Sequence, residues 1–289
     1  MKLSYLIILF SFSNFSFGQT IEQIKSDNDA IAFLRNNFPA LDSFRYPEST
    51  ASDFAENKKW GVSDFDKNGK PDLLIAGTID GVKNLAFVIL ADENNQYKLN
   101  DVSPGGYFFT PVSVIKSVGN DNVILLQQSV SAKKWSDTLI YKYGVFLKYN
   151  SSVKQRKISM LHYRSTGCPG GCPVYKIMLD NTLNVTLEAT RSGSPSSNPA
   201  DSLQGTYYSK LTPEKFSELT ELINYIDLSS LDDRYSVSKT DQPTGIIEIV
   251  FVDGSFKRID DYGKVGTPAL RVFHGYLEKL RFSQLWKSN

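Results

Sequence analysis

Short β-rich runs separated by turn-forming residues follow one another from residue 58 to residue 149, and this pattern strongly constrains the fold. Asn-Gly, Asp-Gly, Asn-Asn and Gly-Asn pairs lie between several of these runs, at 68–69, 80–81, 94–95 and 119–120. Strands joined by tight turns pair antiparallel, whereas parallel strands need long crossover segments. The pattern therefore predicts an antiparallel β-meander or sandwich and argues against βαβ units.

The segment before these runs has the pattern of a helix. In SDNDAIAFLRNNF, the apolar residues Ile31, Leu34 and Phe38 recur at helical spacing. Ser26 or Asp27 can cap the N-terminus, because a short polar side chain accepts a hydrogen bond from a backbone N–H of the first turn. We expect one helix ahead of the β-rich region.

Two further helices are well marked in the second half of the chain. They lie in LTPEKFSELTELINYIDL and TPALRVFHGYLEKLRFSQLW. Thr212 and Thr267 are the expected N-caps, and each is followed by a proline, whose missing N–H has no cost in the first turn of a helix. The first of these helices carries an apolar stripe formed by Phe216, Leu219, Leu222, Ile223 and Ile226.

Strands are expected around these two helices. KISMLHYRS reads as a strand, and VYKIMLD and LNVTLEAT read as a hairpin that turns at Asn181. A Ser/Pro/Gly-rich loop follows at 191–205. In GIIEIVFVDGSFKRIDDYG, a second hairpin, Asp253-Gly254 suits a type I′ turn. The order is therefore ββ-helix-ββ-helix, with the two helices covering one face of the sheet.

A polar break at residues 149–152 separates the two patterns. A chain of 289 residues is long enough for one large or two ordinary domains. We predict an α+β protein with a β-rich domain at 19–150, made of the N-terminal helix and the meander or sandwich. An α+β domain at 151–289 follows it.

The first residues have the form of a secretory signal peptide. Lys2 supplies the positive start, residues 3–12 are an apolar core, and small residues follow. This apolar run is too short for a membrane span, which needs about 20 residues. We expect a signal peptide at 1–18, cleaved near Gly18. The mature protein is then expected in the periplasm or outside the cell, without membrane insertion.

Charge and composition exclude some classes of protein. Hydrophobic residues make up 41% of the chain and charged residues 22%, as in globular proteins. The net charge of +1 and the absence of a basic cluster argue against nucleic-acid binding.

The stretch DFDKNGKPDLLIAG has the spacing of a calcium loop. Acidic or amide side chains fall on every second residue, and Gly69 permits a sharp turn. Ca²⁺ takes six to eight oxygens, whereas Mg²⁺ keeps more of its waters. An EF-hand is excluded, because Ile75 stands where that motif needs a glutamate and a strand follows. The expected ligands are Asp64, Asp66, Asn68, the Lys70 carbonyl and Asp72.

This form, D-x-D-x-N-G-x-x-D-L-L before a strand, resembles the calcium loops of FG-GAP and related extracellular β-repeat proteins. Those proteins stack many copies into a propeller, whereas a single copy occurs here. The resemblance therefore implies one structural Ca²⁺ site and not a propeller. The alternative is a solvated turn rich in Asp and Asn, residues that are common in turns.

The two cysteines of the chain, Cys168 and Cys172, lie in GCPGGCPVY. In an exported chain with two cysteines, a disulfide is the expected outcome. One alternative is a thiol-redox centre, although such centres usually have C-x-x-C at a helix start. A second is a zinc site that adds His162 and His274, the two histidines of the chain.

The second half carries a series of ordered motifs: C-x-x-x-C-P-V-Y before a strand, L-T-P-E-x-F before a helix, then L-D-D-R-Y, K-T-D, D-Y-G and T-P-A-L-R. With these motifs, it resembles a domain-of-unknown-function family of exported bacterial proteins. The resemblance spans about residues 155 to 287 and implies no activity or substrate. The family-typical positions are Cys168, Cys172, Pro173, Tyr175, Asp241, Asp260, Tyr262 and Gly263.

No catalytic signature of a known class is present in the sequence. We expect a non-catalytic exported protein, stabilised by Ca²⁺ and a disulfide, that binds a protein or glycan ligand. The enzyme alternative is a hydrolase with a carboxylate site near Asp241 and Asp260, where Asp261 and Tyr262 also offer acid–base groups. A thiol-redox protein that uses its cysteine pair is a further alternative.

Overall fold

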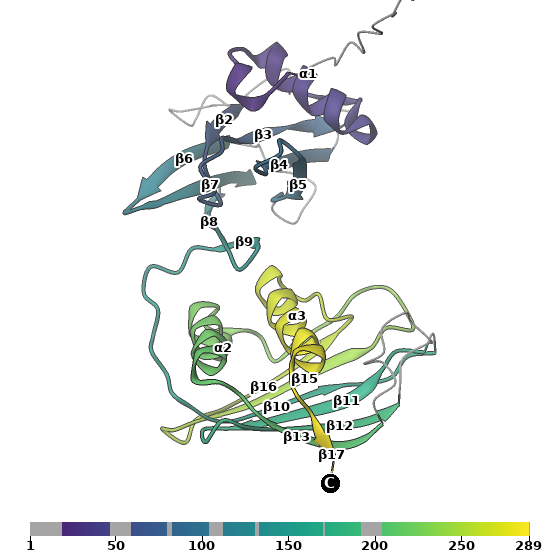
Figure 1. Ribbon diagram of the computed structural model, residues 1–289. Helices are drawn as coiled ribbons and strands as arrows, with labels where there is room; N and C mark the ends of the chain where they lie inside the picture. Colours follow the sequence, from purple (N-terminus) through teal and green to yellow (C-terminus); the bar gives the residue numbers. More distant parts are fainter. Residues whose placement is uncertain are drawn as a thin grey trace, which may run out of the picture. The chain divides into compact units, whose positions relative to one another are not determined.

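The computed structural model describes residues 19–46, 59–79, 83–103, 112–130, 133–169, 171–191 and 204–288 (Figure 1). Three sequence predictions therefore lie outside the described residues: the signal peptide at 1–18, the turn at 80–81 and most of the loop at 191–205. The chain forms two compact units, residues 1–137 and 138–289, and the division falls within strand β8 (Lys133–Lys142).

Unit 1 contains the predicted helix and a β-meander. Strands β2 to β5 are consecutive antiparallel neighbours, β1 pairs with β3 beside β2, and β6 pairs with β7 in a separate sheet. The elements are η1 (Ile21–Gln23), α1 (Asp27–Asn37), η2 (Pro39–Leu41), β1 (Phe44–Arg45), β2 (Trp60–Ser63), β3 (Asp72–Ile79), β4 (Lys83–Ala91), β5 (Tyr97–Asp101), β6 (Val112–Val118) and β7 (Asp121–Val130).

Helix α1 begins where the sequence predicts it, but the residues it buries differ. Ser26 is the N-cap, and its hydroxyl accepts from the backbone N–H of Asp29 at 3.2 Å. Ala30, Phe33 and Leu34 are buried, whereas the predicted Ile31 is only partly buried. The apolar face is thus centred on Phe33, which has an aromatic contact with Tyr97 of β5 at a centroid distance of 4.9 Å.

Unit 2 contains an eight-stranded sheet with two helices on one face (Figure 1). The strand order is β14-β16-β15-β10-β11-β12-β13-β17, and every pair is antiparallel except β14 with β16. The elements after β8 are β9 (Val145–Lys148), β10 (Ile158–Ser165), β11 (Val174–Asp180), β12 (Asn184–Arg191), β13 (Gly205–Lys210), α2 (Pro213–Tyr225), η4 (Leu228–Ser230), β14 (Arg234–Tyr235), β15 (Thr244–Phe251), β16 (Phe256–Tyr262), α3 (Pro268–Ser283) and β17 (Lys287–Ser288).

The α+β class and the two helices of unit 2 are confirmed, with both threonine caps in place. The Thr212 hydroxyl accepts from the N–H of Lys215 at 3.3 Å, and that of Thr267 accepts from Leu270 at 3.0 Å. The sheet has more strands than the sequence predicts: β13 follows the three predicted strands ahead of α2, and the two-residue strands β14 and β17 are added.

The hairpin β15–β16 turns differently from the prediction. A type I′ turn needs positive φ at both central residues, but only Gly254 has one, at 82°, whereas Asp253 does not. The loop closes through Gly254 N–H to the Phe251 carbonyl and Phe251 N–H to the Ser255 carbonyl, both at 2.9 Å. The type I′ prediction is therefore wrong, because the loop is one residue longer and needs left-handed backbone only at the glycine.

In the part of the chain that the structure describes, no helix is both long enough and apolar enough to cross a membrane.

Candidate functional site

The predicted metal loop brings three carboxylates together in unit 1. Asp64, Asp66 and Asp72 each offer an oxygen, and these oxygens all lie within 4.8 Å of one another. Gly69 has φ 83°, and its lack of a side chain is what allows the chain to turn there. Such a group of carboxylate oxygens could hold a metal ion.

Hydrogen bonds hold this loop in shape. Asp64 accepts from the backbone N–H groups of Asn68 at 3.1 Å and Gly69 at 2.9 Å. The Asn68 amide donates to Asp66 at 3.2 Å and to the Ala91 carbonyl at 2.6 Å, so the loop is bonded to the end of β4. The Asn68 side-chain oxygen accepts from the N–H of Lys70 at 2.7 Å, as in other Asx turns.

Asp72 has a structural role in addition to its place in the carboxylate group. It is fully buried, and its two oxygens accept from the backbone N–H groups of Phe65 at 2.7 Å and Ala91 at 2.9 Å. These bonds connect the loop, the start of β3 and the end of β4. Asp72 therefore stabilises the meander whether or not a cation binds.

The same loop is also bonded to β7 within unit 1. The Lys67 ammonium forms an ion pair with Asp121, and the Asn122 amide donates to the Asp64 carbonyl at 2.8 Å. Lys67 has φ 63°, a conformation that is unfavourable for a side-chain-bearing residue. The ion pair and the loop hydrogen bonds offset this cost.

Burial and the neighbouring carboxylates both disfavour the charged form of Asp66 and Asp72 in the loop. The pKa of Asp72 is raised to about 6, mainly by burial and in smaller part by the nearby Asp66 and Asp64, although two backbone hydrogen bonds lower it. Burial also raises the pKa of Asp66, and Asp64 adds to this effect. A bound cation would compensate this concentrated negative charge.

The two cysteines lie at disulfide distance at the end of β10. Cys168 and Cys172 are joined with their Cα atoms 5.2 Å apart, and no described cysteine is free. Zinc binds thiolates, so a disulfide removes the sulfur ligands of the zinc alternative. His162 and His274 are also separated, because His274 contacts Tyr163, and successive residues of a strand face opposite sides of the sheet. The zinc alternative is therefore wrong.

A chain of buried polar groups links β16, α3 and β10 in unit 2. His274 of α3 contacts Asp261 of β16 through Nε2 at 2.9 Å and the Tyr163 hydroxyl of β10 through Nδ1 at 3.1 Å. Both Asp261 oxygens accept from the N–H of Gly266 at 3.1 Å. Because Asp261 acts as the acceptor, Nε2 donates and Nδ1 accepts from the Tyr163 hydroxyl.

This network continues toward the surface through Tyr175. The Tyr163 and Tyr175 rings lie 5.9 Å apart. Tyr175 donates to Glu278, which also pairs with Arg281, and the Arg281 guanidinium lies 4.1 Å above the Tyr175 ring. The Glu278 side chain is 36% exposed, whereas that of Arg281 is 2% exposed.

Lys264 closes the network on the side of the disulfide. Its ammonium donates to the hydroxyl of the buried Ser165 at 2.7 Å, and Ser165 donates to the Pro173 carbonyl at 3.3 Å. Burial lowers the pKa of Lys264, while burial raises the pKa of Tyr163 and Tyr175 above their ordinary values. Such shifts mark an apolar environment that penalises charge.

One glycine makes room for the imidazole. A Cβ at Gly245 of β15 would lie 2.4 Å from a ring carbon of His274 and 2.8 Å from Nδ1. Only a residue without a side chain fits there. Gly245 pairs with both Ser165 and Asp261 across the sheet, so the glycine lies at the centre of the network.

The inner part of the network is closed to solvent. Asp261 and Ser165 are 0% exposed, Tyr163 is 0% exposed and His274 is 4% exposed. Its groups satisfy one another in an apolar core, where an unpaired polar group would be costly. Sequence analysis named Asp261 but missed its partners, because His274 lies 13 residues away on another element.

The carboxylates of the hydrolase alternative have separate partners. Asp260 contacts Arg258, with Arg258 Nε to Asp260 Oδ1 at 3.0 Å, whereas exposed Asp241 contacts the neighbouring Thr240 at 3.5 Å. The Tyr262 hydroxyl accepts from the N–H of Gln242 at 3.2 Å. Asp260 and Asp261 are successive residues of β16, so they face opposite sides of the sheet. No described hydrogen bond joins Asp241 to Asp260.

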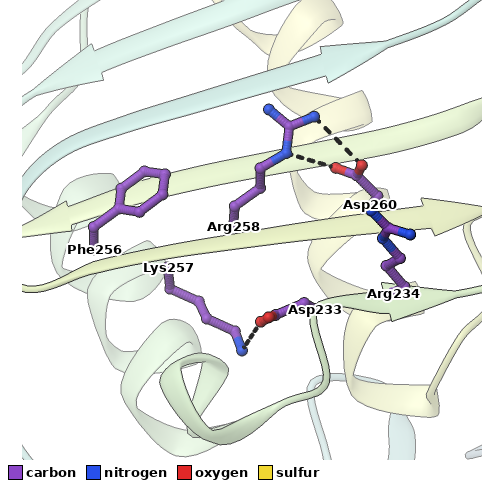
Figure 2. A pocket seen from close by; sticks show the side chains of 6 residues that line it. All are labelled: Asp233, Arg234, Phe256, Lys257, Arg258 and Asp260. Atoms are coloured by element: carbon purple, nitrogen blue, oxygen red, sulfur yellow. Dashed lines mark hydrogen bonds and ion pairs between the residues drawn. The ribbon is translucent and has the colours of Figure 1, made fainter.

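A hollow of about 340 Å³ lies at the edge of the sheet where β14 begins beside β16 (Figure 2). The Lys257 ammonium contacts Asp233 at 2.6 Å within it, and Arg258 contacts Asp260. Phe256 is 60% exposed at its border. The residues that line it are Asp233, Arg234, Phe256, Lys257, Arg258 and Asp260.

Residues 159–281 match the family model described as a domain of unknown function (DUF6438). The resemblance that the sequence motifs predict for the C-terminal half is thereby confirmed. The segment that this model matches runs from β10 into α3, so it contains both the buried network and the hollow. Searches of curated proteins and of solved structures gave no significant match.

Proposed function

We propose that the protein is an exported, non-catalytic binding protein whose DUF6438 domain holds the ligand site at the hollow beside β16. The observation that carries this proposal is the division of polar groups between the two sides of β16. Asp261 and its partners are buried and mutually bonded, whereas Arg258 and Asp260 line an open hollow. The accessible polar groups are therefore placed for contact with a ligand.

The residues that line the hollow are suited to binding a ligand. Three cations and two carboxylates surround it, and the exposed Phe256 ring adds apolar surface. Sites of this size hold small ligands or short segments, with a few polar groups that set orientation. A protein segment and a glycan are both compatible with such groups.

Export is supported by the cysteine pair and by the signal-like N-terminus. Disulfides persist in oxidising compartments and are rare in the cytosol. Cys168 and Cys172 lie at disulfide distance in the DUF6438 domain. Fractionation of cells that produce the full chain tests this part, and a cytosolic pool of uncleaved protein would contradict it.

The loop at 64–72 is proposed to bind one structural Ca²⁺ ion. Asp64, Asp66 and Asp72 supply carboxylate oxygens, and Asn68 and the Lys70 carbonyl complete the proposed ligands. The raised pKa of Asp66 and Asp72, caused first by burial and then by the neighbouring carboxylates, is consistent with the proposal, because a bound cation would favour the charged forms. The ion would fix the loop at the start of β3.

The ligand proposal is tested with two probes on the mature protein, residues 19–289. A printed glycan array and a bead-displayed library of random eight-residue peptides cover both expected ligand classes. Phe256→Ala should weaken binding about tenfold, as expected for loss of an aromatic contact surface. Leu285→Ala is the matched control, because Leu285 is 89% exposed and does not line the hollow. Absence of binding to both probes would contradict the proposed function.

The calcium proposal is tested by thermal melting with Ca²⁺ and with a chelator, in wild type and in Asp66→Asn. The amide keeps a hydrogen-bond acceptor and removes one negative charge. Without Ca²⁺, Asp66→Asn should therefore melt at the same temperature as wild type or higher. With Ca²⁺, it should lose most of the stabilisation that wild type gains. An equal melting temperature of wild type under both conditions would rule out the site.

A further inference from the structure

The edge of β16 beside the hollow carries backbone groups that have no strand partner. β16 pairs with β15 along its length, but on its other side it pairs only with β14, at Asp260 and Asp261. The N–H of Asp260 donates to the Asp233 carbonyl at 2.9 Å, so it points away from β15. Backbone groups two residues apart point to the same side of a strand. The N–H and C=O of Arg258 therefore point to this edge, where the described residues place no strand.

The hollow gives this edge room for a partner strand. It is bordered on one side by residues 233–234 and on the other by β16, so it lies in line with the two-residue strand β14 (Figure 2). Residues 256–259 precede the part of β16 that β14 covers. At about 3.3 Å per residue, they offer about 13 Å of edge. An extended segment of about four residues fits this length.

The charges around the hollow indicate what the segment carries. Lys257 is paired with Asp233, and Arg258 is paired with Asp260. Arg234 is exposed and has no hydrogen bond or ion pair with a described residue. The lining therefore has three cations and two carboxylates, a net charge of +1, and an acidic side chain would complement it.

We propose that this edge binds an extended peptide segment of a partner protein, which adds as a short strand beside β16. Its main chain pairs with the N–H and C=O of Arg258, an acidic side chain faces Arg234, and an apolar side chain packs on Phe256. Main-chain pairing supplies affinity in this mode of recognition, and alternate side chains supply specificity. The inference rests on the proposed binding function and names its ligand class.

The first experiment selects binders from the bead-displayed library of random eight-residue peptides. Selected peptides should share an acidic residue next to an apolar one. Arg234→Glu should weaken their binding at least tenfold, whereas Arg271→Glu, an equal charge change on the exposed face of α3, should leave it unchanged. Equal affinity of both variants would overturn the assignment of Arg234.

The second experiment tests the main-chain bond itself. Arg258→Pro and Arg258→Ala both remove the side chain, but only proline removes the N–H. Proline is tolerated at a strand edge where the N–H faces away from the neighbouring strand. Arg258→Pro should bind the selected peptides about tenfold more weakly than Arg258→Ala, the expected effect of one lost hydrogen bond.

Hydrogen exchange in the wild-type protein makes the same test without a substitution. The Arg258 amide should exchange readily in the free protein and become protected when a selected peptide binds. Unchanged exchange at Arg258 with a bound peptide would overturn the strand-addition proposal while leaving the binding function intact. Glycan binding that depends on Phe256, without any peptide binding, would also overturn the strand-addition proposal and leave the binding function intact. Failure of both ligand classes would overturn both proposals.

Discussion

At the scale of single residues, Asp260 and Asp261 are successive residues of β16 with different roles. Asp261 is fully buried and holds both His274 and the N–H of Gly266, whereas Asp260 lies on the other side of β16 beside Arg258. The period of two in a strand predicts this separation from the sequence. The partners of Asp261 are not predictable in this way, because they come from distant parts of the chain.

Asp261→Ala is expected to destabilise unit 2 by about 3 kcal/mol, because it leaves buried donors of His274 and Gly266 without partners. Asp260→Ala is the matched control and should cost under about 1 kcal/mol, since its contact with Arg258 is solvent-exposed. Urea unfolding followed by far-UV circular dichroism measures both. Equal losses of stability would contradict the structural role of the network.

Gly245→Ala tests the space around the imidazole. The added methyl would meet His274 at 2.4 Å, so the variant should lose about 1–3 kcal/mol of unfolding free energy. Gly275→Ala in α3 has nothing within 4 Å and lies inside a helix, so it should gain up to about 1 kcal/mol. Opposite signs of the two effects in the same denaturation assay are the expected result.

At the scale of elements, the sequence predicts helices better than the edges of the sheet. The apolar stripe of α2 and the Thr-Pro starts of α2 and α3 are local signals, and the structure confirms them. Strands β14 and β17 have two residues each and exist only through pairing with β16 and β13. Such short elements carry no periodicity of their own, so only tertiary contacts define them.

The contact between α2 and α3 gives a pH-dependent prediction. The Tyr276 hydroxyl donates to the Lys215 carbonyl at 2.9 Å, and burial raises the pKa of Tyr276 to about 12. The unfolded chain releases this proton near pH 10. The stabilisation is therefore complete below pH 10 and is lost as the pH rises from 10 toward 12.

Tyr276→Phe should accordingly lower stability at pH 8 by about 1 kcal/mol, the value of one hydrogen bond. The difference from wild type should shrink at pH 11, where wild type loses stability and the variant has no phenol to ionise at this position. Urea midpoints at the two pH values measure this. Tyr208→Phe, which changes an exposed tyrosine of β13, should show no such convergence. A constant difference between Tyr276→Phe and wild type would contradict the prediction.

At the scale of the whole molecule, the two units have separate cores and separate stabilising devices. One cluster of buried apolar residues joins α1 to β3 and β4, and another joins α2 and α3 to the eight-stranded sheet. The carboxylate loop belongs to unit 1 and the cysteine pair to unit 2. Sequence motifs predict the position of each device, whereas the sheet edge beside β14 becomes evident only from strand pairing.

Chelation and reduction should therefore destabilise different parts of the chain. A chelator should lower the unfolding midpoint of unit 1 alone, through loss of the proposed Ca²⁺ ion. Reduction of Cys168–Cys172 should lower that of unit 2 alone, by about 2 kcal/mol for so short a closed loop. Residue-resolved hydrogen exchange at increasing urea distinguishes unfolding of β3 and β4 in unit 1 from unfolding of β10 and β11 in unit 2.

The double variant Cys168→Ser/Cys172→Ser should reproduce the effect of reduction and be insensitive to reductant. A single transition that both treatments shift equally would show that the units unfold together.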